Sequence, residues 1–183
     1  AQVARVRIKI AEDLWSRIDV NGKPHGSAFL KGGGEQRNTR VSTTRDAQTI
    51  ESGSSGLTIL KSSNSSFEGY PKDAFTTLKE TSDRIFATSL RATWRYCTTA
   101  LDFDQTWSAV RQTILETFAQ HESRSVQHTL YAIAEAVLED HTAVDEIHMT
   151  MPNRHCLLID LSRFGMDNEN EIFVPTDEPH GYI

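Results

Sequence analysis

The spacing of apolar residues changes from two to three or four and back again along this chain, which restricts the fold to a mixture of strands and helices. Residues 3–10 alternate apolar and basic side chains, the pattern of a strand with one exposed face. A charged outer face is typical of an antiparallel sheet. We expect the strand to continue to Trp15 or Ile18, before the turn signal at Asn21–Pro24.

Two helices are predicted in the middle of the chain, where apolar residues recur every three or four positions. We expect Asp104 to be the N-cap of the first helix and Ser125 the N-cap of the second, which should end near His141. The apolar positions are Trp107, Val110, Ile114 and Phe118 in the first helix, and Val126, Leu130, Ile133 and Val137 in the second.

Strand patterns flank the two helices. We expect strands at 28–30, 57–61, 83–96, 147–151, 155–161 and 171–174. From residue 57 the order is strand, strand, helix, helix, strand, strand, which predicts an α+β fold: a four-stranded antiparallel sheet with two helices on one face.

Two small-residue segments punctuate this pattern. Gly32–Gly34 predicts a turn or bulge, and the polar run at 51–56 predicts a flexible linker. We therefore expect two units: residues 1–52 as the closing strands of a first module whose opening half is absent, and residues 53–183 as a second module.

Composition excludes several classes of protein. With 19 Lys and Arg against 25 Asp and Glu, the net charge of −6 argues against a general nucleic-acid binder. No apolar run approaches the roughly 18 residues of a membrane span. Cys97 and Cys156 cannot form a disulfide framework and fit a reducing compartment, as small buried strand residues.

Metal and nucleotide motifs are weak in this sequence. His148, His155 and Cys156 lie near one another, but without the tight spacing of a zinc site. No nucleophile elbow or dinucleotide glycine motif occurs. These motifs therefore give no convincing support for a metal or nucleotide site.

Four polar features remain as candidate functional residues, each with a plain structural alternative. Arg84 can bind a planar carboxylate or amide edge, or it is a surface arginine. Ser125–Gln127 can present free N–H groups to an anion, or form an ordinary helix cap. Asn153 and His155 share one side of a strand, over a ligand or as a turn pair. Phe67 is a stacking platform or a buried anchor.

Several segments resemble the urate oxidase family, in the family's order. They are LTILKSSNSSFEGYPKDAFTTLKETSDR at 57–84, SVQHTLY at 125–131, MPNRHCLLIDL at 151–161 and NENEIFVPTDEPHGYI at 168–183. Ile59 departs from the family's usual Leu or Val. The resemblance implies a tunnelling fold (T-fold) with two modules per chain, in a homotetramer with active sites at subunit interfaces. It implies oxidation of urate by dioxygen to 5-hydroxyisourate and hydrogen peroxide, without a cofactor.

The resemblance also implies roles for individual residues. Those expected to bind substrate are Phe67 by stacking, Leu78 as pocket lining, Arg84 and Gln127 on the urate edges, the Val126 N–H on a urate oxygen, and Ser125 beside it. Those expected to take part in catalysis are Asn153, which should hold dioxygen or water, and His155, in the proton relay.

One part of the family pattern is missing. A Lys–Thr pair completes the family's base system, and it comes from the opening part of the first module, which this chain lacks. We expect a substrate-gripping half-site. We expect the protein to be cytoplasmic if its source is bacterial and peroxisomal if its source is eukaryotic. The last residues of this sequence, Gly181–Ile183, show no targeting signal.

Two alternatives from other classes remain open. One is a zinc-dependent, pterin- or purine-handling T-fold enzyme, in which His148 and His155 would converge with a third ligand. The other is an inactive purine-binding structural subunit.

Overall fold

Antiparallel strands and two helices form the computed structural model, which describes residues 3–76 and 80–176. The strands in this part of the chain are β1 (Arg5–Val20), β2 (Lys23–Thr44), β3 (Gln48–Lys61), β4 (Phe86–Tyr96), β5 (Val144–Thr150), β6 (Asn153–Leu158) and β7 (Phe173–Thr176). The helices are α1 (Phe103–Gln120), α2 (Val126–Asp140) and a 3₁₀ turn at Ser162–Phe164. The predicted α+β class and the order from β3 to β6 are confirmed.

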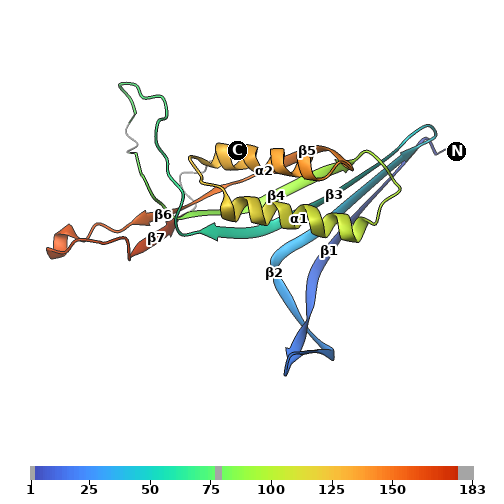
Figure 1. Cartoon of the computed structure of the whole chain (residues 1–183), viewed down its shortest axis with the longest axis horizontal. Helices are drawn as coiled ribbons and strands as arrows, with labels where there is room; N and C mark the ends of the chain where they lie inside the picture. Colours follow the sequence, from blue (N-terminus) through green and yellow to red (C-terminus); the bar gives the residue numbers. More distant parts are fainter. Residues whose placement is uncertain (1–2, 77–79, 177–183) are drawn as a thin grey trace.

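The strands form one continuous antiparallel sheet in the order β1-β2-β3-β4-β6-β7, rather than a separate sheet of four. The free edge of β4 is shared: residues 91–96 pair with β5, and Ala87 and Thr88 pair with β6. Both helices lie on the same face of the sheet, over β3, β4 and β5 (Figure 1). Strands β1 and β2 extend beyond the area of the sheet that the helices cover (Figure 1).

The predicted linker at 51–56 is wrong, because this segment lies inside β3. Its small residues serve close packing: Ser52 and Ser54 are buried, and a Cβ atom on Gly53 would lie 2.4 Å from the Ala92 carbonyl oxygen. The neighbouring strand β4 could not approach a larger side chain this closely. The division into two modules at residue 52 stays a prediction.

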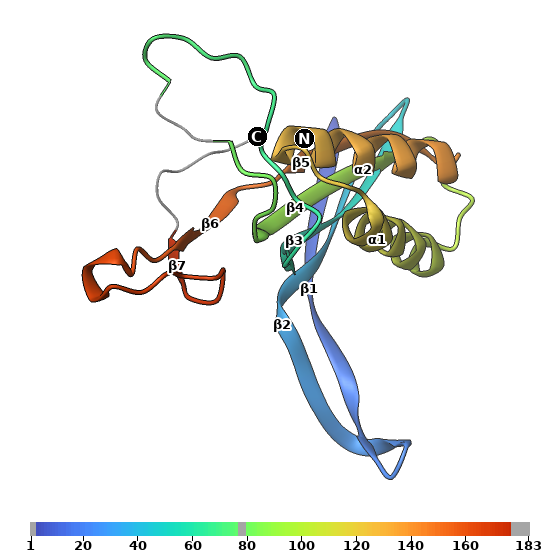
Figure 2. The same ribbon diagram turned by 60° about the vertical axis from the view of Figure 1, so that its left-hand side comes forward.

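Two adjacent bulges bend the sheet. The predicted bulge at Gly32–Gly34 is confirmed by a register shift between β1 and β2, with Gly33 at φ +68°. Beside it, Gly56 has φ +73°, and a Cβ there would lie 2.5 Å from the Gly34 carbonyl oxygen. Beyond the bulges, β1 and β2 leave the sheet as a long arm (Figure 2), which ends in a turn at Asn21 and Gly22.

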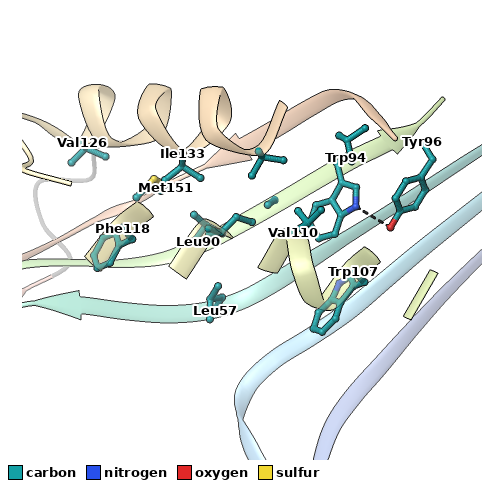
Figure 3. Close-up of a cluster of buried hydrophobic side chains, with 14 of the residues drawn as sticks. Leu57, Leu90, Trp94, Tyr96, Trp107, Val110, Phe118, Val126, Ile133 and Met151 are labelled. Carbon is teal, nitrogen blue, oxygen red and sulfur yellow. Dashed lines mark hydrogen bonds between the residues drawn. The ribbon is translucent and has the colours of Figure 1, made fainter. Parts of the chain in front are cut away.

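The core lies between the helices and the sheet (Figure 3). The predicted helix positions Trp107, Val110, Ile114 and Phe118 are all buried. In α2 the buried positions are Val126, Thr129, Ile133 and Val137, whereas the predicted Leu130 is only partly buried. From the sheet, Leu57, Phe86, Leu90, Trp94 and Met151 complete the cluster.

The helix caps match the sequence pattern with one correction. Ser125 caps α2 by accepting a hydrogen bond from the His128 N–H at 3.1 Å, as predicted. The cap of α1 is Asp102, whose carboxylate accepts from the N–H groups of Asp104 and Gln105. Two aspartates lie two residues apart, and Asp102 is the one with extended backbone geometry.

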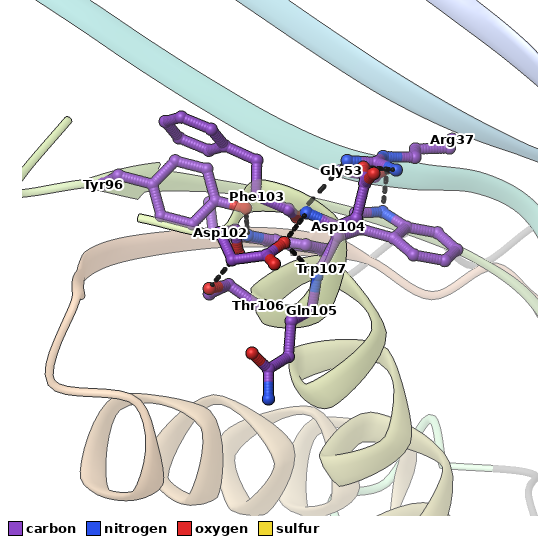
Figure 4. A network of polar contacts seen from close by, with 10 residues as sticks. Arg37, Gly53, Tyr96, Asp102, Phe103, Asp104, Gln105, Thr106 and Trp107 are labelled. Carbon is purple, nitrogen blue, oxygen red and sulfur yellow. Dashed lines mark hydrogen bonds and ion pairs between the residues drawn. The ribbon is translucent and has the colours of Figure 1, made fainter. Parts of the chain in front are cut away.

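Side chains of β2 fasten this strand to α1. The Arg37 guanidinium donates to the Asp104 carboxylate at 2.7 Å and lies over the Trp107 ring, whose indole N–H donates to the Gly53 carbonyl oxygen (Figure 4). Glu35 accepts a bidentate pair of hydrogen bonds from Arg111 at 2.8 and 2.6 Å. These contacts join β2 and β3, in the sheet layer, to α1, in the helix layer.

Apolar side chains of β1, β2 and the arm stay uncovered. Those more than two-fifths exposed include Val6, Ile8, Ile10, Trp15, Phe29 and Leu30. In the described residues, no helix is both long enough and apolar enough to span a bilayer.

Candidate functional site

A buried guanidinium lies at the end of the loop between β3 and β4. The Arg84 Cζ atom is 5.6 Å from the ring centroids of both Phe67 and Phe86. Its Nε and Nη2 atoms are buried and have no hydrogen-bond partner among the described residues. Burial also lowers the pKa of the guanidinium from its ordinary value. A desolvated cationic fork with unused donors is suited to a planar anion.

Phe67 is held in place by its backbone and by its ring. Its N–H donates to the Thr81 carbonyl oxygen at 2.8 Å, and Thr81 returns a bond at 3.2 Å. The ring stacks on Tyr70, with centroids 4.6 Å apart. Phe67 is only partly buried, which favours the platform over the anchor. Sequence reasoning gave Tyr70 no role in the site, because a stacking partner three residues away in a loop leaves no periodic signal.

Backbone hydrogen bonds join this loop to the start of α2. The Arg84 N–H donates to the Ser65 carbonyl oxygen at 2.8 Å, and the Ser66 N–H donates to the Ser123 carbonyl oxygen at 2.7 Å. Residues 125–127 therefore begin close to the loop that carries Arg84. Val126 is buried and Gln127 is exposed. The first-turn N–H groups have no intrahelical acceptor and, with the helix dipole, favour an anion.

Asn153 and His155 come from β6. The Asn153 side-chain amide nitrogen lies 3.4 Å from His155 Nδ1. Asn153 pairs with Thr88 of β4, four residues after Arg84. Since Phe86 and Leu90, two positions to either side of Thr88, point into the core under the helices, Thr88 and Asn153 also lie on that face.

The predicted site residues that the structure describes thus form three groups: Phe67 with Arg84, residues 125–127, and Asn153 with His155. Direct contacts join Phe67 to Arg84, and Asn153 to His155. The start of α2 is connected to the loop through backbone hydrogen bonds, and no side-chain contact links Gln127 to Arg84 in the described ranges. Leu78 lies outside the described residues.

A second polar cluster, beside the start of α2, was missed from the sequence. The Lys61 ammonium group donates to the carbonyl oxygens of Phe118 and His121, at the C-terminus of α1. The rings of His121 and His128 meet edge to face, with centroids 4.4 Å apart. The pKa of His121 is lowered, first by burial and then by the charges of His128 and Lys61, although Glu122 opposes this. No sequence spacing shows that two helices bring these rings together.

We predict that this cluster makes the fold sensitive to acid. Because the folded state holds the pKa of His121 below the ordinary histidine value of 6.5, the unfolded state binds more protons below that pH. His121 therefore contributes its full stability above pH 6.5 and loses it as the pH falls toward the folded pKa. Urea unfolding at pH 7.5 and 5.5 should show a smaller acid-induced loss in His121→Gln than in the parent chain. Equal losses would contradict the prediction.

The candidate metal ligands lie apart. His148 is in β5 and contacts Glu146 at 2.7 Å, whereas His155 is in β6 beside Asn153. No group of three His, Cys, Asp or Glu side chains within residues 3–76 and 80–176 could hold a metal ion. Both cysteines are free, and Cys97 is exposed rather than buried because it follows the last residue of β4.

An antiparallel sheet with this strand–helix order, and with a polar site at its end, defines an α+β protein of the T-fold class. The family model described as Uricase matches residues 50–183. The chain belongs to the uricase family.

Individual relatives agree with this assignment. A uricase from Arthrobacter globiformis is 44% identical over 170 residues, covering 93% of this chain and 55% of the relative. A uricase from Aspergillus flavus is 39% identical and is covered to 63%. The crystal structure of the Arthrobacter globiformis uricase matches 98% of this chain with a TM-score of 0.91 and 42% identity, over 61% of that chain. The chain therefore spans 55–65% of the length of these and other curated relatives.

Proposed function

We propose that this chain supplies the substrate-binding part of a urate oxidase active site. The overall reaction takes urate, dioxygen and water to 5-hydroxyisourate and hydrogen peroxide. Urate loses two electrons, which dioxygen takes up with two protons, while water provides the new oxygen atom. We propose that neither a metal nor an organic cofactor takes part. The observation that carries the proposal is the Arg84 guanidinium beside two aromatic rings, whose buried Nε and Nη2 atoms have no hydrogen-bond partner among the described residues.

The geometry fits a flat purine anion. Phe67 offers a ring to the purine plane, and Arg84 offers two N–H donors to its edge. The Val126 N–H and the Gln127 amide, at the start of α2, would bind other urate atoms, with Ser125 fixing the helix start. Charge-assisted donors stabilise the electron-rich urate anion that transfers electrons to dioxygen.

The oxygen side of the site belongs to β6. Asn153 would hold dioxygen or water over the ring, and His155 would relay the proton. The contact between the two side chains allows the amide to donate to a neutral imidazole, which fixes the tautomer of the ring.

We propose further that the active enzyme is a homotetramer in which a neighbouring subunit completes the site. The uncovered apolar residues on β1 and on the arm support this, because surfaces of this kind mark protein contacts. The Lys–Thr pair that the family resemblance implies, as part of the base system, would then reach the substrate across an interface.

Oxygen uptake tests the proposed reaction. Urate added to the purified full-length protein in aerated buffer should cause oxygen consumption and an equal release of peroxide. Prior treatment with a metal chelator should leave the rate unchanged; loss of activity would favour the zinc alternative. If xanthine, a purine that lacks the C8 oxygen of urate, binds but urate causes no oxygen uptake, the protein is a purine-binding subunit instead.

A further inference from the structure

A fully buried hydroxyl lies next to the proposed oxygen side of the site. Thr88 is 0% exposed, and its Oγ1 atom has no hydrogen-bond partner among the described residues. A buried hydroxyl without a partner is costly, since it has given up its bonds to water. Thr88 therefore needs an acceptor that the folded chain can offer nearby.

Among the described residues directly opposite Thr88 or two positions away along β4, one is polar. Along β4, the residues two positions away are Phe86 and Leu90, both buried and apolar. Across the sheet, Thr88 lies opposite Ile59 of β3 on one side and opposite Asn153 of β6 on the other. Directly opposite residues have Cβ atoms about 4.5–5.5 Å apart, so a small rotation brings the hydroxyl and the amide into contact.

We propose that Thr88 is a positioning residue for Asn153, an inference that rests on the proposed function. The Thr88 hydroxyl donates to Asn153 Oδ1, which fixes the direction of the amide. The amide nitrogen then faces His155 Nδ1, the neighbour it already has at 3.4 Å. Thr88 touches neither urate nor dioxygen, and it acts only by holding the side chain that does.

The test compares two substitutions at this position in the full-length enzyme. Thr88→Val keeps the shape and removes the donor, so kcat should fall about tenfold while KM for urate changes by less than about twofold. Thr88→Ser keeps the donor and should restore kcat. Ser52→Ala is the matched control, because Ser52 is also a buried hydroxyl on the helix side of the sheet, with no hydrogen-bond partner in the part of the chain that the structure describes.

A double-variant cycle separates positioning from a structural role. In the Asn153→Ala background, Thr88→Val should cause no further loss of kcat, because the residue to be positioned is gone. An unchanged kcat in Thr88→Val, or an equal loss in both backgrounds, overturns the inference. A crystal structure gives a readout that does not need activity: Thr88 Oγ1 should lie within hydrogen-bond distance of Asn153 Oδ1, and a longer distance overturns the inference. Failure of the parent enzyme to consume oxygen would instead overturn the proposed function.

Discussion

Replacing Arg84 with methionine is expected to weaken the binding of xanthine by about 100-fold, equal to about 2.8 kcal/mol. Methionine fills a similar volume between Phe67 and Phe86 but removes the charge and the two buried donors. The parent protein has already lost the hydration of this guanidinium, so the bound anion recovers interactions that water no longer supplies. Calorimetric titration under anaerobic conditions measures the loss.

Two further variants show that the guanidinium fork, and not positive charge alone, causes this effect. Arg84→Lys keeps the charge but loses the planar geometry, and it should still bind about tenfold more weakly than the parent. Arg91→Ala removes an exposed arginine from β4, the strand that follows Arg84, and should leave the affinity unchanged. Normal binding by Arg84→Met would show that the purine binds elsewhere.

Replacing Glu35 with alanine is expected to reduce the free energy of unfolding by about 3 kcal/mol. Glu35 is 5% exposed and accepts hydrogen bonds from Arg111 and from the Ser54 hydroxyl. Its removal leaves both donors without their acceptor between β2 and α1. Urea unfolding followed by tryptophan fluorescence measures the change.

The controls use an exposed ion pair and a paired deletion. Arg40→Ala breaks the exposed pair with Glu51 and should cost less than about 1 kcal/mol. The double variant Glu35→Ala/Arg111→Ala should be less destabilised than the sum of its single variants, because it removes the Arg111 guanidinium that Glu35→Ala alone leaves without its carboxylate. Additive losses would mean that the two side chains act independently.

Periodic elements could be predicted from the sequence, and close packing between them could not. The three- and four-residue spacing of apolar residues from Trp107 to Phe118 predicts the helix at 103–120, because an amphipathic helix repeats its burial pattern along the chain. The segment 51–56 was misinterpreted because serine and glycine suit both flexible linkers and close strand contacts. Only the position of Gly53 against Ala92 shows which of the two applies.

For the candidate site too, the sequence indicates which residues take part but not how they are packed. The family resemblance implies roles for Phe67 and Arg84, but the spacing of a loop does not show that two guanidinium nitrogens are buried with no hydrogen-bond partner among the described residues. No sequence pattern distinguishes Thr88, because an isolated threonine in a strand is ordinary. The proposed positioning role of Thr88 depends on the strand register, which places Thr88 opposite Asn153.

The strand order also determines how the chain can fold. Each strand from β1 to β4 pairs with the next one in sequence, so this half of the sheet can grow by adding one hairpin at a time. Joining β4 to β5 and β6 instead closes a loop that contains both helices, which costs more entropy. Phe67 and Arg84 precede that loop, whereas Asn153 and His155 follow it. During synthesis the meander of β1 to β4 can therefore form early, but the candidate site is assembled only when β6 docks.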